Sequence, residues 1–145
     1  MDKLSQVVKA FTVQSGAQIV GIASAEVMNQ FALDNQKPEQ NLPGAKTVIS
    51  FGIRILDSIF KTPNIRISRF SYMYLHDQLD KIAWKVATHL EEIGYDSIPI
   101  PSLGPVELME RGGISGDISH RHAAVQAGLG RIGLSHHFLH PVFGP

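Results

Sequence analysis

Residues 71–94, SYMYLHDQLDKIAWKVATHLEEIG, carry the longest regular pattern in the chain. Apolar side chains recur along it every three or four residues, at Leu75, Leu79, Ile82, Val86, Leu90 and Ile93. That spacing puts them on one face of an α-helix, and Gly94 stands where a left-handed residue commonly ends a helix. The pattern therefore predicts a helix over residues 71–93, with Trp84 off its apolar face.

Shorter patterns precede this helix. Apolar residues at helical spacing near the N-terminus predict an amphipathic helix that ends before Ser15. Residues 18–23, QIVGIA, and residues 46–55 are apolar runs typical of buried strands, the second of them central in a sheet. Residues 24–41 between the two runs are mostly polar.

Turn-forming residues indicate the structure of the remaining segments. Residues 57–68 contain Pro63 and no sustained period, which predicts a surface loop, whereas residues 95–100 resemble a third strand. Prolines and glycines interrupt the chain from there to Gly116 and indicate a loop or lid, before a short helix over residues 119–127. Alternating helices and strands predict a single α/β or α+β domain with a layered sheet flanked by helices.

Composition limits the classes of partner and cofactor. The 145 residues are 43% hydrophobic, and thirteen basic residues balance thirteen acidic ones. A zero net charge disfavours nucleic acid and anionic membranes as partners, and without a signal or spanning segment we expect a cytoplasmic protein. Cysteine is absent, so this chain offers no usual ligands for an iron–sulfur cluster.

A glycine-rich segment runs from Gly128 through Gly130 to Gly133 and matches the dinucleotide pattern G-x-G-x-x-G. In nucleotide-binding folds that pattern follows a strand and opens a helix, whereas here a helical stretch precedes it. A Rossmann site is therefore disfavoured. The glycines either relieve steric strain where a helix ends or keep a path open for a ligand.

The run SHRHAAVQAGLGRIG, residues 119–133, with Phe143-Gly144 after it, resembles a segment of the epoxyqueuosine reductase family. Shorter pieces fit the same order: Gly21-Ile22-Ala23, Leu42-Pro43-Gly44, Tyr72 and Gly94-Tyr95. The resemblance implies a nitroreductase-like fold that binds cobalamin, followed in the family by a ferredoxin-like domain with two iron–sulfur clusters. That cysteine-rich domain has no counterpart in residues 1–145, so the oxidoreductase activity is expected to be incomplete without it.

The resemblance also implies roles for individual residues. Three glycines, Gly128, Gly130 and Gly133, become positions where backbone approaches the corrinoid, with Ser135 just beyond them. His120 and Arg121 belong to the same run and are counted with these cofactor-binding residues. Asp117 is the candidate catalytic acid, although aspartate in such a loop also makes local turn bonds.

Two alternatives remain open from the residues. Nitroreductase-like folds commonly hold FMN, whose phosphate would suit Arg111, Arg121 or Arg131. The other alternative is a non-catalytic interaction module. Such a chain would assemble with itself or with a cysteine-rich partner. A histidine cluster, His120, His122, His136, His137 and His140, suggests a metal, but we expect capping or solvent-facing roles and no metal site.

Overall fold

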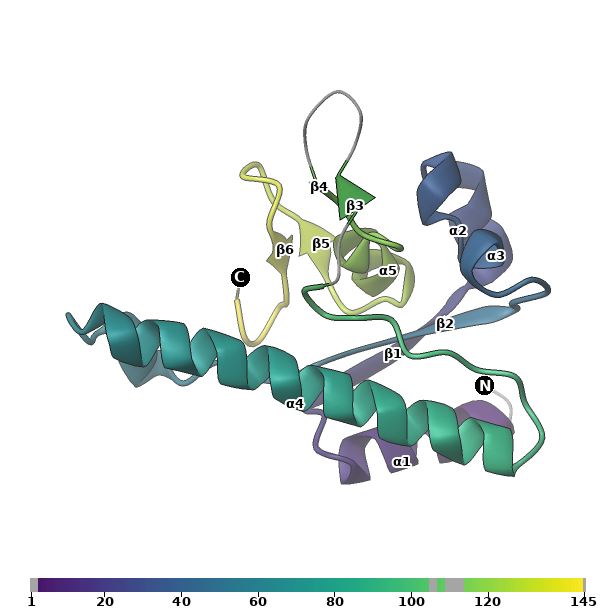
Figure 1. The fold of residues 1–145 in the computed structure, drawn as a ribbon, viewed down its shortest axis with the longest axis horizontal. Helices are drawn as coiled ribbons and strands as arrows, with labels where there is room; N and C mark the ends of the chain where they lie inside the picture. The colour runs from purple at the N-terminus through teal and green to yellow at the C-terminus, as the bar shows by residue number, and fades with distance from the viewer. Residues whose placement is uncertain (1–2, 105–106, 109–113, 145) are drawn as a thin grey trace.

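The computed structural model describes residues 3–104, 107–108 and 114–144, and it mixes helices with short antiparallel ladders (Figure 1). The helices are α1 (Lys3–Gln14), α2 (Ala25–Phe31), α3 (Pro38–Asn41), α4 (Ile65–Glu92) and α5 (His120–Gln126), with 3-10 turns at Asp34–Gln36 and Asp57–Phe60. The strands are β1 (Ile19–Ser24), β2 (Thr47–Gly52), β3 (Glu107–Leu108), β4 (Ile114–Ser115), β5 (Arg131–Ile132) and β6 (Phe138–Leu139). This composition confirms the α+β class.

β1 and β2 form an antiparallel ladder whose register runs from Ile19 opposite Gly52 to Ser24 opposite Thr47. Among the described residues this sheet has two strands, and β3–β4 and β5–β6 form separate two-stranded ladders. The prediction that residues 46–55 form a central strand is therefore wrong in its placement, because β2 has β1 on one side and lies at an edge on the other.

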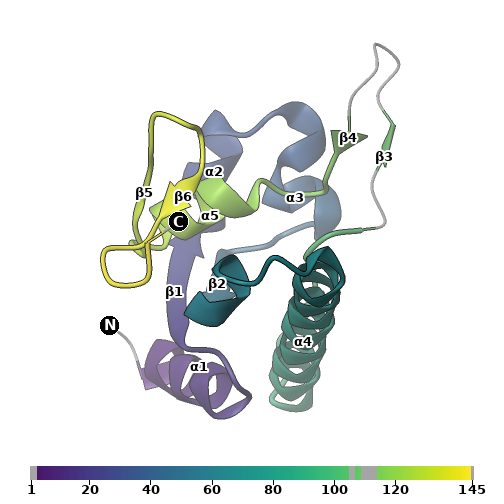
Figure 2. The ribbon, with the colours of Figure 1, turned by 90° about the vertical axis from the view of Figure 1, so that its left-hand side faces the viewer.

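Helices cover both faces of the β1–β2 sheet (Figure 2). On one face α1 and α4 supply a buried cluster of Val8, Ile82, Val86 and Leu90, against which Ile49 and Phe51 of β2 pack. On the other face α2 and α5 supply Met28 and Ala123, and Val48 packs there. Successive strand residues point to opposite faces, so the alternation of Val48 and Ile49 puts β2 between two helical layers.

α4 is longer than its sequence pattern indicated. It begins at Ile65, where the Asn64 side chain accepts a hydrogen bond of 3.1 Å from the backbone N–H of Arg66. The loop predicted over residues 57–68 is thus wrong from Ile65 onward. The other end is confirmed, because Gly94 has φ +90° just beyond the helix. Trp84, which lies off the apolar face, was expected to pack in the core or at an interface, but it is 67% exposed and does not belong to the core.

One segment had no predicted element, and another differs from its prediction. Residues 24–41 contain α2, which is capped by the Ser24 side chain, and α3, which begins at Pro38. Residues 95–100 are not a strand and run as irregular chain between α4 and α5. The short helix after Ser119 is confirmed as α5. Within the described ranges, no helix has the length and apolarity needed to cross a membrane.

Candidate functional site

A cavity of about 370 Å³ lies where the chain enters α5. Two short segments line it, residues 101–103 after the irregular stretch and residues 116–121 at the start of α5, together with Gln36. The three residues Asp117, His120 and Arg121 are all at its wall. The structure thus brings together the predicted catalytic acid and two of the predicted cofactor-binding residues.

Asp117 is held in place through its backbone. Its carbonyl oxygen accepts a hydrogen bond of 2.8 Å from the side-chain amide of Asn41, in α3. The next residue, Ile118, is buried at 7% exposure and anchors the turn, whereas Asp117 itself is exposed. The carboxyl group is therefore carried on a fixed turn at the cavity, where a bound molecule can reach it.

His120 joins α5 to the segment on the opposite wall. Its Nε2 atom lies 3.0 Å from the carbonyl oxygen of Pro101. A carbonyl oxygen can only accept, so in this contact Nε2 carries the proton and donates it. The contact holds Pro101 against the first turn of α5 and fixes the separation of the two walls at this point.

Arg121 links the cavity to the C-terminal part of the chain. One guanidinium nitrogen, Nη1, donates to the carbonyl oxygen of His136. A guanidinium has five N–H donors in a planar fork, so one such bond leaves capacity for an anionic or carbonyl group. Arg121 is exposed, which places a fixed positive charge at the rim of the cavity.

Ser102 fixes the far wall by contacts with α4. Its backbone N–H donates to the Asp80 carboxylate at 2.8 Å, and its hydroxyl lies 2.9 Å from Nδ1 of His76. No pattern in the sequence indicated that Ser102 or Pro101 belongs to the site. Their placement depends on contacts with residues about twenty positions away in the chain.

The glycine-rich segment packs against the chain's own C-terminal ladder. A Cβ at Gly130 would lie 2.1 Å from the Leu139 carbonyl oxygen, and one at Gly133 would lie 2.8 Å from Leu139 Cδ1. Gly128 has φ +74° at the end of α5, and its Cβ direction is open. Ser135 is exposed, with its hydroxyl 3.2 Å from Nδ1 of His137. These four residues lie outside the walls of the cavity.

The remaining histidines make local contacts. His122 lies 2.7 Å from the Ser119 hydroxyl, and the His140 ring accepts from the backbone N–H groups of Val142 and Phe143. His136 has φ +60° in its turn. No group of three or more potential metal ligands occurs within residues 3–104, 107–108 and 114–144. Arg111, the remaining candidate for a phosphate contact, lies outside the described residues.

The residues of two ion pairs with a shifted pKa are not among those that line this cavity. Lys37 lowers the pKa of Asp34 through a hydrogen bond of 2.6 Å and its charge, and Asp77 raises the pKa of Lys81 in the same way at 2.7 Å. Both pairs are local contacts within a helix or turn.

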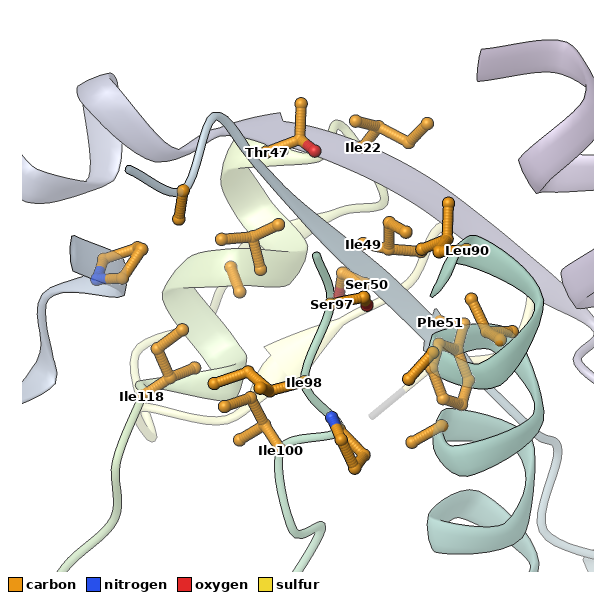
Figure 3. A pocket seen from close by; sticks show the side chains of 18 of the residues that line it. Ile22, Thr47, Ile49, Ser50, Phe51, Leu90, Ser97, Ile98, Ile100 and Ile118 are labelled. Atoms are coloured by element: carbon orange, nitrogen blue, oxygen red, sulfur yellow. The ribbon is translucent and has the colours of Figure 1, made fainter. Parts of the chain in front are cut away.

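A larger cavity of about 790 Å³ adjoins the first one and shares Ser102, Ile118, His120 and Arg121 with it. It lies between β2, α4 and α5 (Figure 3). Ile49 and Phe51 of β2, Leu90 of α4, and Ile98 and Ile100 of the irregular segment surround it. Its walls are thus mostly apolar, and the polar residues that it shares with the smaller cavity are Ser102, His120 and Arg121.

Comparison with models of known protein families gives no match, and comparison with curated proteins and with solved structures gives no significant match either.

Proposed function

We propose that the chain is a redox-cofactor-binding domain of the epoxyqueuosine reductase type, with cobalamin as its cofactor. The observation that supports this most is the meeting of Asp117, His120 and Arg121 at one cavity. The proposal includes a nitroreductase-like arrangement of the sheet and its flanking helices.

The groups at this cavity suit the periphery of a corrinoid. Amide side chains and a phosphate surround a corrin ring, and Arg121 supplies N–H groups at the cavity for such acceptors, whereas the Nε2–H of His120 already donates to Pro101. Asp117 supplies an exposed carboxyl group that could assist proton transfer to a substrate. Gly130 and Gly133 fit less well, because β6 already fills the space beside them, and only Gly128 leaves its Cβ direction open.

A spectroscopic titration tests the proposal. Cob(II)alamin added to micromolar protein should show a changed visible spectrum that saturates with protein concentration. An unchanged spectrum, with the protein shown to be folded by circular dichroism in the same buffer, contradicts cobalamin binding.

FMN is the second candidate, and the position of Arg121 favours it. A guanidinium at the rim of a cavity binds phosphate in a bidentate manner, and the adjoining apolar cavity offers room for a flat ring system. Arg131, which was paired with it in the sequence interpretation, lies on β5 away from both cavities. Quenching of FMN fluorescence on addition of protein supports this candidate, and unchanged fluorescence removes it.

The third candidate function is not enzymatic: the chain would act as an interaction module that assembles with another protein chain. The N-terminal half of α4 exposes large apolar side chains, Ile65, Ile67, Phe70, Met73 and Tyr74. Exposed apolar groups gathered on one helix favour association with a second copy or with a cysteine-rich electron-transfer partner. Sedimentation velocity over a range of protein concentrations tests self-association, and a single monomeric species throughout contradicts it.

A further inference from the structure

β2 has a backbone edge that faces the larger cavity. The Ala25 N–H donates to the Lys46 carbonyl oxygen at 3.0 Å, so Lys46 turns its backbone groups toward β1. In an antiparallel ladder, alternate residues turn their N–H and C=O groups toward the partner strand and the others turn theirs away. Thr47, Ile49 and Phe51 therefore direct their backbone groups away from β1. No hydrogen bond from these groups to another part of the described chain is found.

The cavity runs along this edge. Five successive residues of β2, from Thr47 to Phe51, line it. Successive side chains of a strand point to opposite faces, so a cavity that touches all five lies beside the strand and reaches both faces. α4 closes it on one side through Val86 and Leu90, and α5 closes it on the other through Ala123 and Ala124. A strand placed there would be covered on both faces.

Residues 96–100, here named the strap, line the opposite wall of the same cavity (Figure 3). β2 is followed by α4 and then by the strap, which is the order of a β-α-β unit. That connection places its second strand parallel to the first in the same sheet. The chain order therefore suits the strap as a third strand, beside β2.

The two ends of the strap are fixed and its length is that of a strand. The Tyr95 N–H donates to the Leu90 carbonyl oxygen, and the Ser102 hydroxyl donates to the His76 carbonyl oxygen. These two helix positions are about 21 Å apart at roughly 1.5 Å per residue of helix. The connecting chain from Tyr95 to Ser102 spans about 23 Å when extended at roughly 3.3 Å per residue. The strap is therefore nearly as extended as a strand.

Pro99 decides which edge of the strap can pair. Proline has no N–H, so in a sheet it is tolerated where its backbone faces away from the neighbouring strand. With Pro99 turned outward, Ile98 and Ile100 turn their backbone groups toward β2.

In this structure the strap lies apart from β2, and we propose that in solution it moves onto β2 as a third, parallel strand and that this closure shuts the larger cavity. Closure gives partners to the outward groups of Thr47, Ile49 and Phe51 and removes apolar walls from water. A ligand within the larger cavity would have to hold the strap open. The closed state itself requires no cofactor, so it is independent of the proposed function.

Amide hydrogen exchange measured by NMR on the ligand-free full chain tests the closure. Thr47, Ile49 and Phe51 should exchange at least tenfold more slowly than an unstructured chain. Val48 and Ser50, which face β1, report whether the sheet itself is intact. Exchange of Thr47, Ile49 and Phe51 at the unstructured rate, with Val48 and Ser50 protected, overturns the proposal.

Proline substitutions distinguish closure from other causes of protection. Ile98→Pro removes an N–H that faces β2, and it should abolish the protection of Ile49 and Phe51. Ser97→Pro removes an N–H that faces away and should leave that protection in place, and Ile98→Ala controls for the lost side chain. Protection that survives Ile98→Pro overturns the proposal. If Ile98→Pro unfolds the sheet, a nuclear Overhauser contact between the backbones of Ile98 and β2 in the wild type decides, and its absence overturns the proposal.

Discussion

Gly130 lies directly against the carbonyl group of Leu139, so that a Cβ at position 130 would stand 2.1 Å from that oxygen. The ring of Phe138 would lie 2.8 Å from the same Cβ. Gly130 is not among the described residues with positive φ, so its backbone is accessible to other amino acids and the constraint is purely one of space. The close approach is made by β6 of the same chain.

Gly130→Ala should therefore destabilise the ligand-free protein, by about 1–3 kcal/mol, as an overpacked contact with rigid backbone does. Chemical denaturation of the variant measures this free energy. Gly116→Ala is the matched control, because its Cβ would meet the Ile118 carbonyl oxygen at an ordinary 3.7 Å and should change stability little.

A different result would support a role for Gly130 in cofactor binding. If Gly130→Ala leaves the ligand-free stability unchanged but weakens cobalamin binding, the open space at residue 130 serves the ligand and not the packing against β6.

The core between α4 and the sheet gives a second prediction. Ile82 is 5% exposed and belongs to the buried cluster on this face. Ile82→Ala should cost about 2–5 kcal/mol in the free energy of unfolding, because it removes buried methyl groups and leaves a cavity. Trp84→Ala changes an exposed residue of the same helix and should cost far less. Equal losses for the two variants would contradict the assigned orientation of α4.

Local patterns were sufficient to predict the elements that bury a continuous apolar face. The spacing from Leu75 to Ile93 predicted most of α4, and Gly94 predicted its end. The first turns of α4 could not be found in this way, because Ile65, Ile67 and Phe70 are exposed and form no stripe. Residues 95–100 have the composition of a strand but no ladder, because strand formation depends on a partner as well as on the residues themselves.

The beginning of α4 gives a third prediction. The Asn64 side chain caps the helix by accepting from the Arg66 N–H at 3.1 Å. Asn64→Ala removes that acceptor and should reduce stability by about 0.5–2 kcal/mol, whereas Asn64→Asp or Asn64→Ser keeps it and should restore most of the loss. Thermal unfolding followed at 222 nm compares the variants. If Asn64→Ala is as stable as the wild type, the cap at Asn64 does not stabilise the helix, and the stable part of α4 begins nearer Ser71.

The candidate site was predictable only in part. Asp117, His120 and Arg121 are close in sequence, so their gathering at the start of α5 follows from a short turn and one helical turn. The opposite wall, at Pro101 and Ser102, is brought there by His120, His76 and Asp80 through long-range contacts. No periodic signal marks such contacts, which is why this wall was missed.

The most direct test of cofactor binding at this cavity is the dissociation constant for cobalamin in wild type, Arg121→Gln and Arg131→Gln. Arg121 lies at the cavity and Arg131 does not, although both are exposed arginines of the same segment. Loss of a hydrogen bond from a charged group costs about 1.5–3 kcal/mol, so Arg121→Gln should weaken binding at least tenfold while Arg131→Gln binds like wild type. Melting curves without ligand establish that both variants are folded. Equal affinity in all three folded proteins, or no binding by the wild type, would contradict the proposed site.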